Sequence, residues 1–253
     1  MPPTEQPQLR KMTLRDVPGV LQWIAAVDEE DAAQARQEFA ENLDGQYLFA
    51  DGERLIGTTG FEPIEGTDGS CWLGWTATAP DARPEDAVAM LAELVTRLQA
   101  NEVRKVFAET SDPAEAGLRE LLVQAGFQEE LRHEGYYESG EAMVGLGLRL
   151  FPPAPEPIDA DERAPRLLDL LEIDDADGTY FVDWEFADEA GPDELAQAVE
   201  FARGRGGRVL FASAPSHAVG AARAFEAAGL QRAGRWLDFH EDDVHEEHYR
   251  RDL

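Results

Sequence analysis

The chain has 253 residues, 43% of them hydrophobic and 9% aromatic, which is enough apolar material for one large or two small folded domains. It carries 22 Lys and Arg residues against 52 Asp and Glu residues, a formal net charge of −30. Such an acidic chain without a basic cluster repels phosphate backbones and anionic lipids, which argues against electrostatic binding of nucleic acid or of a membrane surface.

The acidic charge is spread along the whole chain. Residues 1–150 contain 12 basic and 28 acidic residues, and residues 151–253 contain 10 and 24. Only Lys11 and Lys105 are lysines, a bias that fits a high-salt source or a GC-rich one. We therefore treat a dependence of stability on salt as a hypothesis.

The N-terminus has neither the charged nor the apolar region of a signal peptide, and no apolar run reaches the length of a membrane span. A cytoplasmic location is therefore expected. The single cysteine, Cys71, excludes an internal disulfide and a cysteine metal cluster. Its apolar neighbours Trp72 and Leu73 predict a small buried side chain rather than a nucleophile.

Hydrophobic periodicity predicts a mixture of strands and helices in the first 150 residues. In chain order, the expected elements are strand 8–13, helix 16–27, helix 31–42, strand 46–50, strand 55–63, strand 70–78, helix 84–101, strand 105–110, helix 113–125, strand 128–136 and strand 141–150. The helix over 84–101 begins at Pro84, where a missing N–H costs nothing. In the helix that follows, Asp112 is expected to cap the N-terminus and Glu115 to reach back, and Gly126 ends it.

A stretch rich in proline and acidic residues, Phe151–Glu162, divides the chain. We expect an extended linker and a connecting helix over 151–174. The predicted strand 180–186, helix 192–203, strand 208–212, helix 216–228 and strand 231–239 then repeat the order seen from residue 70 to 136. Trp184 corresponds to Trp75 in this repeat, and Val209-Leu210-Phe211 to Val106-Phe107-Ala108. We interpret the pattern as a duplication with domains at 1–150 and 175–253, and coincidence is the alternative.

Residues 8–150, with this order of elements and with Ala125-Gly126-Phe127 closing the second long helix, resemble the GCN5-related N-acetyltransferase (GNAT) superfamily. Residues 175–253 resemble the later half of the same fold. The resemblance implies an α+β fold, a mixed β-sheet flanked by helices, in two copies of which the second is shorter. It also implies binding of acetyl-CoA and transfer of its acetyl group to an amine.

In that superfamily a loop of the form Arg/Gln-x-x-Gly-x-Gly/Ala leads into a helix whose N-terminal amides hold the CoA pyrophosphate. Arg83 matches this pattern, whereas Asp86 and Val88 stand at its two small-residue positions and Pro84 removes an amide. Acidic residues in the first turn stabilise a bare helix N-terminus and oppose a pyrophosphate. The resemblance assigns the following residues to acetyl-CoA: Trp75, Thr76, Ala77, Thr78, Arg83, Asp86 and Ala87.

The tyrosine that the superfamily often uses as general acid is replaced here by Leu122 and, in the second copy, by Phe225. A transferase needs a group that takes a proton from the ammonium and one that returns a proton to the thiolate. The candidates for these roles are Glu109, Tyr136, Tyr137 and Glu62. The alternative for each is an ordinary surface or strand-end side chain.

Three histidines lie among five carboxylates from His240 to His248. Their spacing is not that of a helical zinc site, so we interpret the segment as a solvated acidic hairpin between the last two strands, without a metal. Two functions stay open. One is an acetyl-CoA-dependent N-acetyltransferase acting on a small-molecule or protein amine, with a cationic amine favoured by the acidic surface. The other is a catalytically inactive GNAT-like binding or interaction module.

Overall fold

The computed structural model describes residues 7–27, 29–137, 140–173, 176–187 and 194–253. These residues form two β-sheets and six α-helices, so the chain has the expected α+β architecture. The first part contains β1 (Gln8–Lys11), α1 (Val17–Ala25), α2 (Glu29–Glu41), β2 (Gln46–Asp51), β3 (Arg54–Pro63), β4 (Ser70–Leu73), β5 (Ala77–Thr78), α3 (Pro84–Ala100), β6 (Lys105–Asp112), α4 (Ala116–Gln124), β7 (Gln128–His133) and β8 (Ala142–Arg149).

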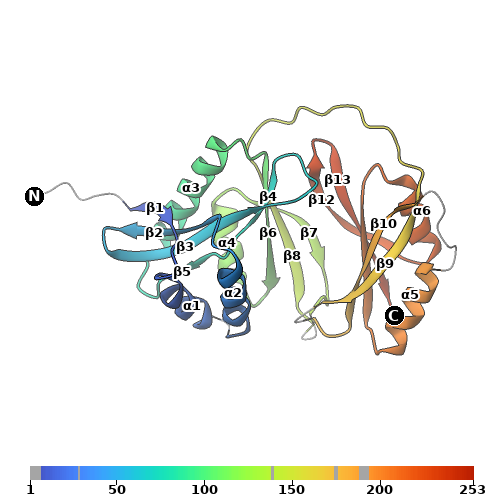
Figure 1. The fold of residues 1–253 in the computed structure, drawn as a ribbon, viewed down its shortest axis with the longest axis horizontal. Helices are drawn as coiled ribbons and strands as arrows, with labels where there is room; N and C mark the ends of the chain where they lie inside the picture. Colours follow the sequence, from blue (N-terminus) through green and yellow to red (C-terminus); the bar gives the residue numbers. More distant parts are fainter. Residues whose placement is uncertain (1–6, 28, 138–139, 174–175, 188–193) are drawn as a thin grey trace, which may run out of the picture.

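The second part begins after an extended segment that arches over the molecule in Figure 1. It contains β9 (Ala164–Glu172), β10 (Thr179–Ala187), α5 (Glu194–Gly204), β11 (Val209–Pro215), α6 (Val219–Ala227), β12 (Gln231–Glu241) and β13 (Val244–Asp252). Figure 1 shows the two sheets side by side, with α1 to α4 on the first and α5 and α6 on the second. In the described part of the chain, no helix is long and apolar enough to cross a membrane.

The two sheets share one strand order over five strands. The first sheet runs β1-β2-β3-β4-β6-β8-β7, with β5 added beside β3, and the second runs β9-β10-β11-β13-β12. The pairs β4/β6 and β10/β11 are parallel, and the other neighbours are antiparallel. Ser70 pairs with Lys105 in the first sheet, and Thr179 pairs with Val209 in the second. When Ser70 is matched with Thr179, Phe107 corresponds to Phe211. This correspondence differs by one residue from the match expected from the sequence. That the two halves arose by duplication remains a prediction.

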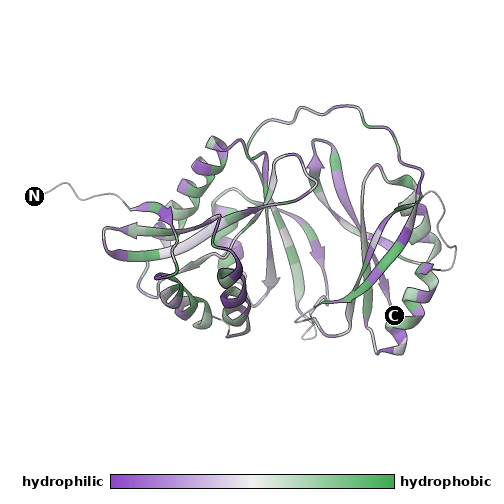
Figure 2. Cartoon of the chain, in the orientation of Figure 1, coloured by the Kyte–Doolittle hydropathy of each residue, from purple (hydrophilic) through white to green (hydrophobic). Residues whose placement is uncertain are grey.

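Residues 164–172 correct the expected connecting helix. They form strand β9, which pairs antiparallel with β10 from Ala164 opposite Ala187 to Glu172 opposite Tyr180. Leucine fits a helix as well as a strand, and here the long pairing with β10 overrides helix propensity. Figure 2 shows both hydrophobic and hydrophilic residues along this strand. The extended linker is therefore shorter than expected, and the second sheet begins at Ala164.

Two local predictions were also wrong. Helix α4 begins at Ala116, and Asp112 does not cap it, because its carboxylate lies 2.6 Å from Arg119 and 2.6 Å from Arg132. Glu115 does reach back, accepting the amide of Ser111 at 2.8 Å. The expected single strand over 70–78 is interrupted, since only residues 70–73 and 77–78 are paired.

Aromatic side chains fill the space between the sheets. Trp236 of β12 is 2% exposed, and its ring lies edge-on to Phe107 and Trp72 of the first sheet, with centroids 5.1 and 5.4 Å apart. A Cβ on Gly234 would lie 2.3 Å from Leu131 Cδ1, so β12 and β7 meet at very close range. Burial of these rings stabilises the contact by dispersion and by the hydrophobic effect. The two sheets therefore share a core.

A buried ion pair also joins the sheets. Lys105 Nζ lies 2.6 Å from Glu130 Oε1 and donates to the carbonyl of Leu237 at 2.6 Å, while the Leu237 amide donates to Glu130 Oε2 at 2.9 Å. Burial lowers the pKa of Lys105, and the pairing with Glu130 opposes that change. The ion pair thus binds the amide and the carbonyl of Leu237, a residue of the second sheet.

Candidate active site

A cleft opens where two central strands of the first sheet separate. β4 and β6 pair only from Ser70 to Trp72, opposite Lys105 to Phe107. Beyond that point the chain leaves β6, and Thr78 pairs with Gly57 of β3 instead. The resulting cavity of about 660 Å³ lies between β4, β5 and β6 and is bordered by α1, α2 and α4.

Gly74 allows the strand to turn away at this point. A Cβ there would lie 2.2 Å from Gln46 Nε2 and 3.1 Å from the Gly60 carbonyl carbon. The Gly74 amide donates to the Gly60 carbonyl at 2.8 Å, which fixes the bend against β3. A side chain would push the bend away from β3, so the mouth of the cleft depends on this glycine.

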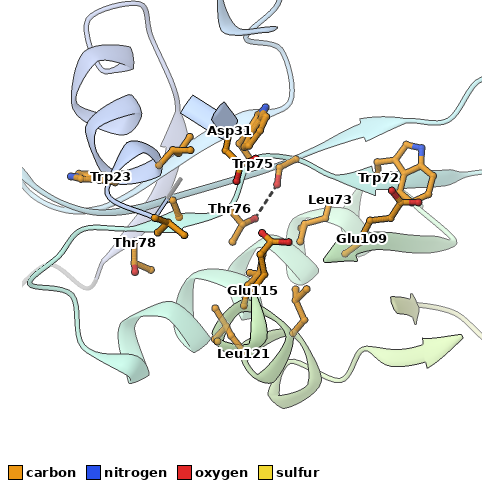
Figure 3. A pocket seen from close by; sticks show the side chains of 18 of the residues that line it. Trp23, Asp31, Trp72, Leu73, Trp75, Thr76, Thr78, Glu109, Glu115 and Leu121 are labelled. Atoms are coloured by element: carbon orange, nitrogen blue, oxygen red, sulfur yellow. Dashed lines mark hydrogen bonds between the residues drawn. The ribbon is translucent and has the colours of Figure 1, made fainter. Parts of the chain in front are cut away.

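Five of the residues assigned to acetyl-CoA line the cleft: Trp75, Thr76, Ala77, Thr78 and Ala87. The Trp75 indole donates to Glu38 of α2 at 2.6 Å, and the Thr76 hydroxyl lies 3.0 Å from the hydroxyl of Thr59. Figure 3 shows Trp75, Thr76 and Thr78 among the side chains that line the cavity. The structure therefore brings this part of the predicted set together.

Arg83 and Asp86 are not in the cleft wall. Asp86 accepts the Arg83 amide at 3.2 Å and pairs with its guanidinium at 2.6 Å, so it caps α3. This contact lowers the pKa of Asp86 and raises that of Arg83. The amides of Asp86 and Ala87 point to the Arg83 carbonyl. The amides of Arg83, Asp86 and Ala87 thus bond within the chain, and Pro84 supplies no donor.

Glu109 of β6 and Glu62 of β3, two predicted catalytic residues, both line the cleft. Solvent reaches Glu109 through the open cleft, yet the surrounding walls disfavour its charged form and raise its pKa to about 7. In Figure 3 Glu109 points toward Trp72, and Glu115 points toward the strand that carries Thr76. Glu109 is therefore a carboxylate that gains and loses a proton near neutral pH.

Tyr136 and Tyr137, the other predicted catalytic residues, follow β7 and are not among the residues that line the cavity. Both pack in the cluster that includes Trp72 of the cleft wall, and their rings lie edge-on with centroids 5.1 Å apart. Burial and the nearby charge of Glu109 raise the pKa of Tyr136 to about 12 and that of Tyr137 still further. Both phenols are protonated at neutral pH and can donate a proton.

Several lining residues were missed in the sequence analysis. Trp72 was considered only as an apolar neighbour of Cys71, and Glu115 only as part of a helix cap. Both line the cleft, as do Trp23 and Asp31 from the α1–α2 region. Glu115 both lines the cleft and reaches back at the start of α4, since one of its carboxylate oxygens accepts a hydrogen bond from the Ser111 amide. No sequence signal identifies the residues of α1 and α2, because their place over the cleft depends on long-range packing.

Comparison with known proteins gives the fold of this site. No family model matches the sequence, and no curated protein does. A solved GNAT-family acetyltransferase from Desulfovibrio desulfuricans aligns over 58% of this chain and 100% of its own, at 24% identity and a TM-score of 0.52. This chain contains a GNAT fold.

Other solved structures match the GNAT fold more weakly. An aminoglycoside 6'-acetyltransferase type Ii covers 58% of this chain at 10% identity and a TM-score of 0.49, over 99% of its own length. A ribosomal-protein-alanine N-acetyltransferase from Brucella melitensis covers 56% at 18% identity and a TM-score of 0.44, again over 99% of its length. The match therefore concerns the fold, and it accounts for little more than half of the chain.

In the second sheet the place that corresponds to the GNAT cleft is closed by a side chain. Trp184 lies five residues after Thr179, as Trp75 lies five after Ser70. Its indole donates across to the Ser213 carbonyl of β11 at 2.8 Å, and its ring packs edge-on against Phe186 and Phe225. Trp184 therefore spans the gap between β10 and β11.

The histidine-rich segment is only partly the solvated turn that was expected. The turn consists of Asp242 and Asp243, and strand β13 begins at Val244. His248 is 8% exposed and lies 3.1 Å from the buried His133, between the sheets. Strand pairing with β11 draws this half of the segment into the core. Among the described residues, no group of three His, Cys, Asp or Glu side chains is placed to hold a metal ion.

Cys71 is 1% exposed, and burial raises the pKa of its thiol to about 12. The prediction of a buried, unreactive cysteine is confirmed.

Proposed function

We propose that the chain is an acetyl-CoA-dependent N-acetyltransferase that acts on an amine in the cleft of the first sheet. The observation that carries this proposal is the cavity of about 660 Å³ that opens where β4 and β6 separate, with the carboxylate of Glu109 in its wall. A general base works best when its pKa lies near the working pH.

The residues fit one end of acetyl-CoA better than the other. Backbone groups from Trp75 to Thr78 line an open strand edge that suits a pantetheine arm. At the start of α3, by contrast, Asp86 accepts the Arg83 amide, the amides of Asp86 and Ala87 bond to the Arg83 carbonyl, and Pro84 has no amide to donate. We therefore expect acetyl-CoA to be held mainly through its acetyl-pantetheine end.

The cleft residues can carry the proton transfers of the reaction. Glu109 takes a proton from the acceptor ammonium, and the freed lone pair attacks the thioester carbonyl carbon. The carbon–sulfur bond then breaks, and the sulfur receives a proton from Tyr136, Tyr137 or water. The nitrogen gives up its second proton, which replaces the proton that the tyrosine or water has donated. The products are an N-acetyl amide and the free thiol of CoA.

The charge of the cleft favours a cationic acceptor. Five lining residues are acidic: Asp31, Glu38, Glu62, Glu109 and Glu115. None of the described residues that line the cavity is Lys, Arg or His. Carboxylates attract an ammonium and repel an anionic amine such as glutamate.

The test is transfer of labelled acetyl from acetyl-CoA to spermidine, with glutamate as the anionic control amine. Glu109→Gln should lower kcat/KM for spermidine by about 10²–10⁴-fold, the usual contribution of a general base. Glu62→Gln, which removes another carboxylate of the cleft lining, is the matched control and should lower it much less. Equal losses in both variants, or loss in Glu62→Gln alone, would show that Glu109 is not the base.

The occupied first turn of α3 favours a second candidate, a GNAT-fold module that binds no acetyl-CoA and acts through a partner. The two functions separate without any acceptor, because only the transferase shows heat of binding when acetyl-CoA is titrated into the folded chain.

A further inference from the structure

Two corresponding contacts join the two halves of the chain. In each, a hydroxyl of one half donates a hydrogen bond to a backbone carbonyl of the other half. In the first, Arg104 donates to the Ser70 hydroxyl at 2.7 Å and to the Asp68 carbonyl at 2.7 Å. Ser70 in turn donates to the carbonyl of Phe239, at 2.7 Å. Phe239 belongs to β12, so this contact fixes the second domain against the first.

The second contact repeats the first with the roles of the domains exchanged. Arg208 donates to the Thr179 hydroxyl at 3.3 Å and to the Asp177 carbonyl at 2.8 Å. Thr179 donates to the carbonyl of Tyr136 at 2.7 Å, and Arg208 reaches the same carbonyl at 3.2 Å. Thr179 is fully buried, which makes this hydrogen bond costly to lose.

The second contact bears on the candidate active site. Besides its carbonyl, Tyr136 is held through its ring, which packs on Phe211 of β11 with centroids 5.5 Å apart. Arg208 also donates to the carbonyl of the preceding residue, Gly135, at 3.2 Å. Tyr137, the next residue, packs against the same apolar cluster as Trp72, which lines the cleft. Residues of the second domain thus form hydrogen bonds with the backbone next to both tyrosines.

We propose that Thr179 and Arg208 of the second domain are positioning residues that hold Tyr136 and Tyr137 beside the first domain's cleft. This inference rests on the proposed function for its kinetic consequence. It gives the second domain, whose own cleft is filled by Trp184, a role in the reaction of the first.

Thr179→Val tests the proposal because it removes the donor with little change of volume. Thr179→Ser keeps the hydroxyl and should restore the wild-type behaviour. Ser70→Ala is the matched control, since it removes the corresponding hydroxyl from the other contact. Thermal melts of all three variants establish that each is folded.

The first readout is amide hydrogen exchange, which needs no substrate. Thr179→Val should speed exchange in the peptide that carries Tyr136 and Tyr137, whereas Ser70→Ala should speed it in the peptide that carries Phe239. Wild-type exchange at Tyr136 and Tyr137 in Thr179→Val would overturn the proposal, whatever the activity of the chain.

The second readout is steady-state kinetics with spermidine and acetyl-CoA. Thr179→Val should lower kcat/KM for spermidine about fivefold, the value of one hydrogen bond, and leave KM for acetyl-CoA within about twofold. An equal loss in Ser70→Ala, or no rescue by Thr179→Ser, would show a general loss of stability instead. If the wild-type chain acetylates no amine, the proposed function fails, and the exchange result alone decides the positioning role.

Discussion

The contact between Gly145 and Trp236 offers a sharp test of how the two sheets pack. Gly145 lies in β8, and a Cβ on it would lie 2.3 Å from Cη2 and 2.6 Å from Cζ2 of the Trp236 indole. The indole is rigid, 2% exposed and held edge-on by Phe107 and Trp72, so it cannot move aside easily. Gly145→Ala should therefore lower the free energy of unfolding by about 1–3 kcal/mol, the usual cost of overpacking.

The assay is urea unfolding followed by circular dichroism, with linear extrapolation to water. Gly19→Ala is the matched control, because a Cβ there meets nothing within 4 Å in helix α1. It should leave the free energy of unfolding unchanged or raise it by about 0.5–1 kcal/mol through helix propensity.

A double-mutant cycle identifies the indole as the cause. Trp236→Phe removes the outer ring atoms that the new Cβ would meet, so Gly145→Ala should cost less than about 0.5 kcal/mol in that background. The same cost in both backgrounds, or no cost in the wild-type chain, would refute this packing of the two sheets.

Three further predictions concern pH and salt. The kcat/KM for an amine should rise with pH through an apparent pKa near 7 as Glu109 loses its proton, and a wild-type profile that is flat from about pH 6 to 8 would exclude this base. Burial lowers the pKa of His133 to about 4 and that of His248 to about 3, while unfolded histidines take up a proton near 6.5. The two neutral histidines therefore make their full contribution to the free energy of unfolding above about pH 6.5, and this contribution is lost as the pH falls toward 4. His248→Gln should flatten the dependence of the urea midpoint on pH over that range. Because the net charge is −30, the thermal midpoint at pH 7 should rise between about 0.1 and 2 M KCl as the repulsion is screened, and an unchanged midpoint would count against salt dependence.

Local sequence signals account for the elements of the first sheet. The proline at the start of α3 and the glycine after α4 mark real helix ends, and the apolar spacing predicts the buried face of α3. The prediction of a helix for residues 164–172 was wrong because the leucines of this segment fit a helix or a strand equally well. Only the antiparallel pairing with β10, a contact between distant parts of a folded chain, decides between them.

The candidate site was predictable where it lies on consecutive residues. The resemblance to the GNAT superfamily pointed to Trp75 to Thr78, and Glu109 was a candidate at the end of the strand that follows the helix 84–101; all of them line the cleft. Glu115 and Asp31 enter the cleft from helices whose packing no periodic pattern specifies. The contact of Thr179 with Tyr136 was beyond prediction for the same reason, because it depends on how the two sheets pack against each other.

The most direct test of the account is calorimetric titration of the folded chain with acetyl-CoA, in low and in high KCl. The account predicts one molecule bound per chain, in the cleft of the first sheet, because Trp184 fills the corresponding place in the second. Absence of heat and of any thermal shift in both salts, with the chain shown to be folded, would contradict the transferase function. Two molecules per chain would contradict the assignment of a single site.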